Sequence, residues 1–245
     1  MQSQSRTVAT GHGWDWFKGG FDLFRKAPLI WIVFTIVLLV MAMALSMVPL
    51  VGHLLFYFVS PLFVAGLMLG CRDLEAGKDL EIAHLFAGFQ KDAAQLVTVG
   101  GVYLVGQVLV FGAMVTVGGG VVAVLFREGA GGLDPTLLME AAGGLLAAAL
   151  VGMALSVPLL MAVWFAPQLV VLDGVPALAA LRLSFSACLR NMLPFLLYGL
   201  VVLVAALVAA VPFGLGYLVL VPVLIASAYV SYRDLFPLPG SVPTP

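Results

Sequence analysis

Three histidines and two cysteines are the side chains best suited to metal binding or redox chemistry in this sequence. His12, His53 and His84 lack the short spacings of a zinc site, so they predict solvated or interfacial side chains. Cys71 and Cys188 could act as reactive thiols, but small packing residues are the commoner role of isolated cysteines. No metal centre is predicted from these five residues.

The motifs that usually identify an enzyme are missing from the sequence. It has no Walker loop, no Gly-x-Ser-x-Gly elbow, no His-Glu-x-x-His helix and no Cys-x-x-Cys pair. We therefore expect no catalytic residue, no metal and no cofactor, and a protein that is not an enzyme.

An Arg-Asp-Leu triplet occurs twice, at residues 72–74 and 233–235. At the C-terminal end of a helix the dipole favours arginine but not aspartate, so each aspartate needs a partner. We predict that a basic residue of a neighbouring segment, such as Lys26 or Arg190, holds each aspartate. The alternative is a set of exposed ion pairs, each contributing well under about 1 kcal/mol. The predicted ionic lattice comprises Lys26, Arg72, Asp73, Arg190, Arg233 and Asp234.

The composition places these residues in a membrane protein. Of the 245 residues, 63% are apolar and 9% are charged, and the mean hydropathy is +1.16. An average soluble domain has roughly 45–50% apolar and 25% charged residues, so a soluble globular protein is excluded. The net charge of −1 provides no field to attract nucleic acid, which we exclude as a partner.

Four long runs contain no Asp, Glu, Lys or Arg. They span residues 27–71, 93–126, 141–172 and 191–232. Because about 20 apolar residues cross a bilayer, the first and last runs hold two crossings each, with Pro-Gly turns near their middles. The fold class is therefore all-α: a single polytopic membrane domain over residues 1–245 with six transmembrane helices in three hairpins. With their leading segments, the hairpins span residues 12–74, 79–172 and 175–235, followed by a flexible Pro-rich tail at residues 237–245.

Basic residues lie almost entirely on one side of the predicted membrane. Ten are on the side of both termini, and only Arg127 is on the other, so the positive-inside rule predicts cytoplasmic termini. Cys71 and Cys188 lie on this side, where thiols stay reduced, so we expect no disulfide.

A short amphipathic segment precedes each hairpin. Apolar residues recur at spacings of three and four, which places them on one helical face. We expect these faces to lie in the headgroup plane, although extensions packed on the bundle are an alternative. The membrane-interface residues are Trp14, Phe17, Phe21 and Phe24, then Ile82, Leu85 and Phe89, then Leu178, Leu181 and Phe185.

Hairpins one and three form an internal repeat in the same orientation, which makes them parallel repeats. Their scarce proline and charged positions match in order at offsets of 161 to 166 residues. The matched pairs include Lys26 with Arg190, Pro61 with Pro222, and Asp73 with Asp234.

The middle hairpin carries small residues at intervals of four, a pattern that lets membrane helices approach closely. We expect the two stripes to face each other, with a second protomer as the alternative partner for one of them. Its long helices either tilt in the bilayer or project beyond it, and Pro158 and Pro167 are possible kinks. Residues 127–133 are expected to form the external loop. The helix-packing residues are Gly112, Thr116 and Gly120, and Gly144, Ala148, Gly152 and Ser156.

Four stretches resemble an uncharacterised proteobacterial family of six-pass inner-membrane proteins. More distantly, they are similar to the membrane domain of bacterial glycerophosphodiester phosphodiesterases. The resemblance implies a bacterial inner-membrane location and brings no catalytic residue. The stretches are FRKAPLIW at residues 24–31, LFAGF at 85–89, FSACLRN at 185–191 and SYRDLF at 231–236.

These patterns favour a non-enzymatic helical bundle that binds or organises membrane lipid or a protein partner of unknown identity. Self-association into a homo-oligomer is plausible from the small-residue stripes. The alternative is a transporter or channel for an apolar or amphipathic solute, which a water-lined cavity near Gln107 and Gln168 would favour.

Overall fold

The computed structural model describes residues 5–48, 51–128 and 135–237, and within these residues every regular element is a helix. Six of the helices are long and apolar enough to cross a membrane, which confirms the all-α polytopic architecture. Predictions that fall on residues 129–134 and 238–245, including most of the external loop and of the Pro-rich tail, lie outside the described residues.

Hairpin one and its leading segment form three helices, α1 (His12–Lys26), α2 (Pro28–Ser46) and α3 (Val51–Glu75). The second leading segment is the 3₁₀ helix η1 (Ile82–Phe89), and the long helices α4 (Ala93–Glu128) and α5 (Pro135–Trp164) follow it. A short helix, α6 (Ala166–Asp173), continues α5 after a break at Phe165, next to Pro167. The third segment and hairpin are α7 (Ala177–Arg190), α8 (Met192–Ala210) and α9 (Tyr217–Leu235).

The chain divides into two compact units. Residues 1–101 and 161–245 form the first unit, and residues 102–160 form the second. The middle hairpin thus contributes to both units.

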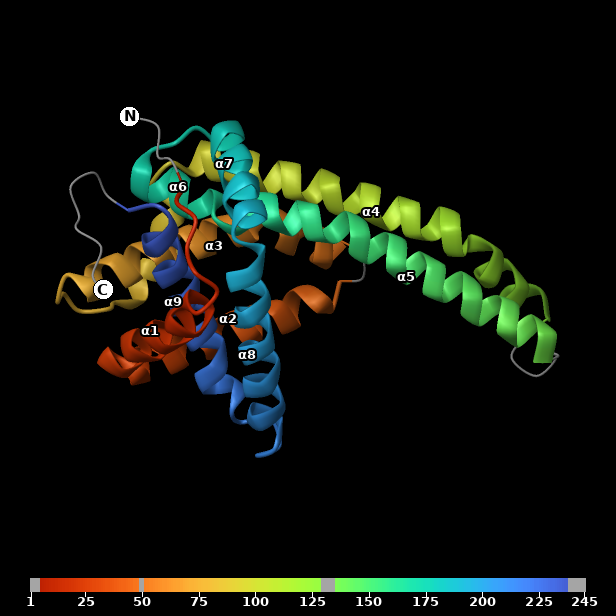
Figure 1. The fold of residues 1–245 in the computed structure, drawn as a ribbon, viewed down its shortest axis with the longest axis horizontal. Coiled ribbons are helices and arrows are strands. Elements are labelled where there is room, and N and C mark those ends of the chain that lie inside the picture. The colour runs from red at the N-terminus through yellow and green to blue at the C-terminus, as the bar shows by residue number, and fades with distance from the viewer. Residues whose placement is uncertain (1–4, 49–50, 129–134, 238–245) are drawn as a thin grey trace. The chain divides into compact units, whose positions relative to one another are not determined.

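In the first unit, α3 and α9 are inner helices and α2 and α8 are outer ones. The apolar windows of α3 and α9 are 56% and 50% buried, against 17% for α2 and α8. Helix α6 packs on α3, and its residues from Ala166 to Val171 are all buried. Helix α1 packs on α9 and α8, η1 on α3, and α7 on α6 (Figure 1). Each leading segment therefore covers the last helix of a hairpin.

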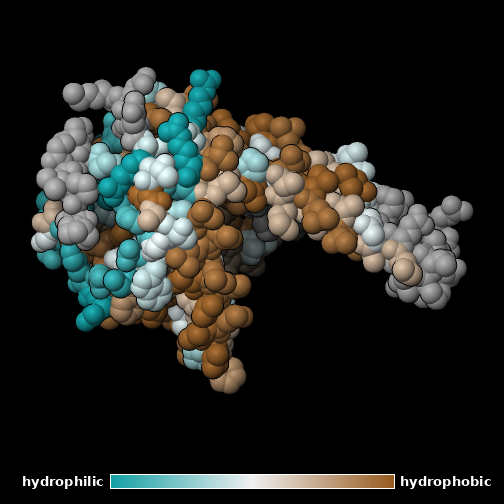
Figure 2. Space-filling model, in the orientation of Figure 1, coloured by the Kyte–Doolittle hydropathy of each residue, from teal (hydrophilic) through white to brown (hydrophobic). Residues whose placement is uncertain are grey.

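The hydrophilic surface of this unit gathers over α1 and α7, whereas hydrophobic surface follows α8 (Figure 2). The Arg-Asp-Leu triplets lie at the C-terminal ends of α3 and α9. The aspartate of α3 contacts η1, and the aspartate of α9 contacts α1. We call this the charged end of the bundle, and the end with the turns between α2 and α3 and between α8 and α9 the turn end.

Both hairpins of the first unit turn in the same way. Gly52 of α3 packs against the backbone of Leu45, and Gly216, at the start of α9, packs against that of Ala209. Gly52 and Gly216 are 164 positions apart in the sequence, and so are Leu45 and Ala209. The packing at the turns therefore follows the repeat seen in the sequence.

In the second unit, α4 and α5 meet through small residues, as membrane helices commonly do. Ala148 and Gly152 of α5 are buried at this contact, and Gly144 and Ser156 are half-buried on the same helix. Gly118 of α4 lies against Ala148, and Met114 of α4 lies against Gly152.

The stripe predicted on α4 is not the contact face. Gly112 and Thr116 are exposed, and Thr116 bonds only the Gly112 carbonyl of its own helix. Gly106, Val110, Met114 and Gly118 form the contact stripe instead. Helix α4 carries glycines on several faces, so the spacing alone selected the wrong one. The surroundings of Gly120 lie outside the described residues.

Candidate functional site

Asp234, near the end of α9, binds three side chains from the N-terminal part of the chain. His12 Nδ1 lies 2.8 Å and Trp16 Nε1 lies 2.7 Å from its Oδ2 atom, and Arg6 forms an ion pair with Oδ1. Arg6 also donates from Nε to the Asp234 carbonyl at 2.6 Å. The carboxylate is largely buried, so these donors replace water around it.

Asn191, between α7 and α8, forms two hydrogen bonds with the backbone of the same N-terminal segment. Its Oδ1 accepts a bond from the Val8 amide at 3.0 Å, and its Nδ2 donates to the Arg6 carbonyl at 3.1 Å. Residues 6–8 are therefore fixed between α9 and the start of α8.

Asp73, at the equivalent place on α3, has longer contacts. His84 Nε2 of η1 and Arg72 each lie 3.4 Å from a carboxylate oxygen, and Lys78 lies at 3.6 Å. The predicted partners were wrong in identity. Lys26 donates to the Leu74 carbonyl rather than to Asp73, and Arg190 is exposed at the end of α7 while Asp234 is bound from α1.

A leading segment nevertheless contacts each aspartate: α1 contacts Asp234 and η1 contacts Asp73. Ring nitrogens of Trp16 and His84 contact the two aspartates beside basic side chains such as Arg6 and Lys78. Arg233 pairs instead with Glu75 of α3 at 3.4 Å, and Tyr229 donates to the same carboxylate at 2.6 Å.

The contact that positions these rings recurs in the fold. Gly20, four residues after Trp16, lies against the carbonyl of Val223 on α9. Gly88, four residues after His84, lies against the carbonyl of Leu62 on α3. Leu62 and Val223 are equivalent in the repeat, at its offset of 161 residues. A glycine therefore allows each segment to touch the backbone of an inner helix.

The third segment makes a related contact through a hydroxyl group. Ser184 of α7 is buried, donates to the Met161 carbonyl at 2.6 Å and accepts from the Phe165 amide at 2.9 Å. It thereby satisfies the backbone where α5 breaks before α6. A small residue thus makes the contact in all three leading segments: Gly20 on α9, Gly88 on α3 and Ser184 at the break between α5 and α6.

The predicted interface residues divide between two environments. Leu85 is fully buried, Phe24 and Leu181 are largely buried, and Phe17 is half-buried. The leading segments are therefore partly packed on the bundle and partly exposed. Each of the two expected arrangements, a face in the headgroup plane and an extension packed on the bundle, describes some of these residues. The exposed members are Trp14, Phe21, Ile82, Phe89, Leu178 and Phe185.

A shallow apolar groove of about 330 Å³ joins α1 to α8. Trp14 and Phe17 line it from α1, and Leu200, Val201, Val204 and Ala205 line it from α8. These α8 residues lie further from the charged end than Gly13, which packs on Pro194 and Tyr198. The aromatic face of α1 thus points along the apolar surface of α8, the orientation of a helix lying in a headgroup plane.

A larger apolar cleft of about 400 Å³ lies between α2, α3 and α9, within the membrane-spanning helices. Its polar groups are already bonded within the protein. The Thr35 hydroxyl donates to the Trp31 carbonyl at 3.0 Å, Ser60 to Tyr57 at 3.3 Å, and Tyr217 to Ala206 at 3.2 Å. The lining residues include Leu38, Ala42, Phe56, Phe63, Leu67, Leu218, Val221 and Ile225.

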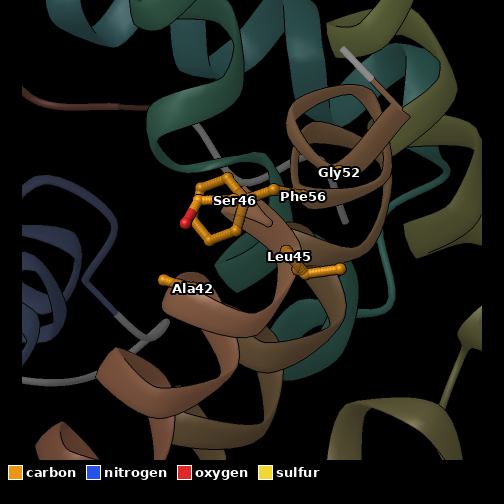
Figure 3. Close-up of a pocket in the computed structure, with 5 residues that line it drawn as sticks. All are labelled: Ala42, Leu45, Ser46, Gly52 and Phe56. Atoms are coloured by element: carbon orange, nitrogen blue, oxygen red, sulfur yellow. The ribbon is translucent and has the colours of Figure 1, made fainter. Parts of the chain in front are cut away.

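A smaller pocket of about 200 Å³ adjoins this cleft at the turn end, and Ala42 and Phe56 line both. We call it the turn pocket. Leu45, Ser46 and Gly52 complete its wall, and the Phe56 side chain reaches from α3 toward Ser46 of α2 (Figure 3). The Ser46 hydroxyl donates to the Met43 carbonyl at 2.7 Å. No pattern in the sequence predicts either hollow.

The residues considered for other chemistry lie apart from these hollows. Gln168 is buried on α6 with an unpaired Oε1, and Gln107 is half-buried on α4, but neither lines the three hollows described above. Cys71 and Cys188 are free and buried, and burial raises the pKa of the Cys188 thiol to about 12. Among the described residues, no three His, Cys, Asp or Glu side chains could hold a metal ion.

Comparison with known proteins identifies a similar chain. A protein of Burkholderia thailandensis, described as a probable inner membrane protein, is 37% identical over 227 residues. The match covers 91% of the present chain and 82% of that protein. No protein-family model matches the chain. No solved structure matches it either.

Proposed function

Because this chain belongs to the family of the probable inner membrane protein of Burkholderia thailandensis, we propose that it is a non-enzymatic inner-membrane protein that binds membrane lipid. The single observation that carries the proposal is the cleft between α2, α3 and α9. A hollow that lies within membrane-spanning helices and offers almost only apolar surface is suited to a hydrocarbon chain. Filling it restores the dispersion contacts that an empty hollow lacks.

The leading segments supply the surface of this lipid-binding bundle. Trp14 and Phe21 are exposed on α1, next to polar Asp15, Lys18 and Asp22. Aromatic side chains beside charged ones are typical of the membrane boundary. With ten basic residues on the side of both termini, the charged end lies in the cytoplasm in this proposal. The more distant similarity to the membrane domain of phosphodiesterases remains a prediction.

Lipid retention during purification tests the proposal. The wild-type protein, released in a mild detergent and analysed by native mass spectrometry, is expected to carry bound phospholipid. Ala42→Phe places a ring in both the cleft and the turn pocket, so the retained lipid should fall at least about fivefold. Ala44→Phe is the matched control, because Ala44 is exposed two residues away on the same helix.

Equal retention by the wild-type protein and Ala42→Phe would show that the lipid is merely peripheral and would reject the proposal. A transporter for an apolar solute is the second candidate. Prolines at equivalent places in the two inner helices, Pro61 and Pro222, favour it, because such positions can bend a membrane helix. Release of an amphipathic dye from proteoliposomes containing the protein would support it.

A further inference from the structure

The cleft extends through about half the thickness of a membrane. Its lining runs over residues 56–67 on α3 and over residues 217–225 on α9, and it also includes Gly214 in the turn before α9. At 1.5 Å per residue, the lined stretch of α3 is about 16 Å long and that of α9 about 12 Å, and the hydrocarbon core is about 30 Å thick. The cleft therefore matches the chain region of one leaflet.

The end of the cleft nearer the charged end is closed. Thr35, Leu67 and Ile225 are its last lining residues in that direction. One turn further along α2, the Trp31 ring is completely buried and meets the buried Phe34 ring edge to face, with centroids 5.8 Å apart. A chain in the cleft has no space beyond these rings.

The other end of the cleft reaches the turns. Gly214, between α8 and α9, lines the cleft itself, and the turn pocket extends it to Ser46 and Gly52. Phe56 lines both hollows. A chain that enters from the turn end therefore meets a largely apolar path, with the hydroxyl groups of Ser46 and Tyr217 near its entrance.

Neither hollow offers a charged group to a lipid headgroup. All lining residues belong to the runs at residues 27–71 and 191–232, which contain no Asp, Glu, Lys or Arg. An anionic headgroup gains no ion pair from the residues that line the hollows, so its charge adds little to the binding free energy there.

We propose that the cleft takes one acyl chain of a lipid from the leaflet at the turn end, with the methyl end at Thr35 and the ester end at Phe56, and that it does not select headgroup charge. The observation behind this is the closed end at Thr35 and, at the turns, an open end where the described lining residues carry no charge. This inference rests on the proposed function, because it requires that the cleft binds lipid.

Photoreactive lipids test the direction of the chain. Two phosphatidylcholines, with a diazirine close to the ester or at the methyl end of one chain, are incorporated into vesicles with the full-length protein. After illumination, peptide mapping by mass spectrometry locates the adducts. The methyl-end probe should label near Thr35, Leu67 and Ile225, and the ester-end probe near Leu45 and Phe56. Phosphatidylglycerol with the same chains should label within about twofold of phosphatidylcholine.

The outcomes separate the inference from the proposed function. The reversed order of adducts would show that the chain enters from the charged end, and a strong preference for phosphatidylglycerol would show headgroup selection. Either result overturns the inference while leaving lipid binding intact. Equal labelling of wild type, Ala42→Phe and Ala44→Phe would reject both. Val221→Phe, on the α9 wall, repeats the comparison if Ala42→Phe does not fold.

Discussion

The indole Nε1 of Trp16 donates a 2.7 Å hydrogen bond to Oδ2 of Asp234, 218 positions later in the chain. The equivalent aspartate on α3, Asp73, has the imidazole of His84 in the same role, at 3.4 Å. Through the first contact, the first helix of the chain covers its last helix. Through the second, η1 covers α3 in the same manner.

The two aspartates should differ in their contribution to stability. Asp234→Asn removes a charge that three donors share in a largely buried place, so we expect the free energy of unfolding to fall by about 2 kcal/mol. Asp73→Asn should cost less than about 1 kcal/mol, because its basic partners are exposed and distant. Thermal unfolding in one detergent measures both. Equal melting temperatures for wild type and Asp234→Asn would contradict the assignment.

The close contact of α1 with α9 predicts a sharp effect at Gly20. A Cβ atom there would lie 2.6 Å from the Val223 carbonyl oxygen and 2.7 Å from the Ser227 amide nitrogen. Gly20→Ala should therefore lower stability by about 1–3 kcal/mol. Gly199→Ala, in α8, is the control, since nothing lies within 4 Å of a Cβ at that position, and it should leave stability unchanged or raise it slightly. The account would be wrong if both variants melted alike.

The second unit offers a test of which glycine packs. Gly118→Leu should weaken the contact of α4 with α5, because even a Cβ at Gly118 would lie 3.0 Å from the Ala148 Cβ. Gly112→Leu should be tolerated, since a Cβ there meets nothing within 4 Å. The cross-linking yield between cysteines placed in α4 and α5 would report the difference. A larger effect at Gly112 would restore the stripe predicted from the sequence.

The buried thiols should resist modification. Cys188 has a pKa raised to about 12 by burial, so at about pH 8 only around one thiol in 10⁴ is ionised. A maleimide should therefore leave Cys188 and Cys71 unmodified in the folded protein and label both after denaturation. Lys18→Cys, on the exposed side of α1, is the positive control. Rapid labelling of the native cysteines would contradict their burial.

The membrane helices and leading segments could be predicted from the sequence because their signals are local. A charge-free run of sufficient length is enough to identify a crossing, and the spacing from Trp14 to Phe21 identifies an amphipathic helix. The repeat also carried information beyond its own residues, because a ring nitrogen of a leading segment contacts both Asp73 and Asp234.

The partners of the aspartates could not be predicted, because they depend on contacts between distant parts of the chain. Arg6 lies in a segment with no periodic pattern, and nothing local indicates that α1 covers α9. On α4, small residues on several faces made the stripe ambiguous. The cleft has no signature in the sequence, because it is the space left between three apolar helices. Each of these helices has the composition of an ordinary membrane crossing, whether or not a cleft lies beside it.

The orientation of the bundle gives a further prediction. A cytoplasmic reporter such as green fluorescent protein, fused after Phe236, should be active, and a periplasmic reporter such as alkaline phosphatase at the same place should be inactive. The reverse result would place the charged end and its ten basic residues outside the cytoplasm.

A density map of the protein in a lipid nanodisc tests lipid binding most directly. The account predicts elongated, unbranched density between α2, α3 and α9, continuous from the turn pocket at Ser46 to the closed end at Thr35. The same density should be absent from Ala42→Phe and present in Ala44→Phe. A cleft that is closed by its own side chains in the wild-type map, with no chain density at Phe56, would contradict the account.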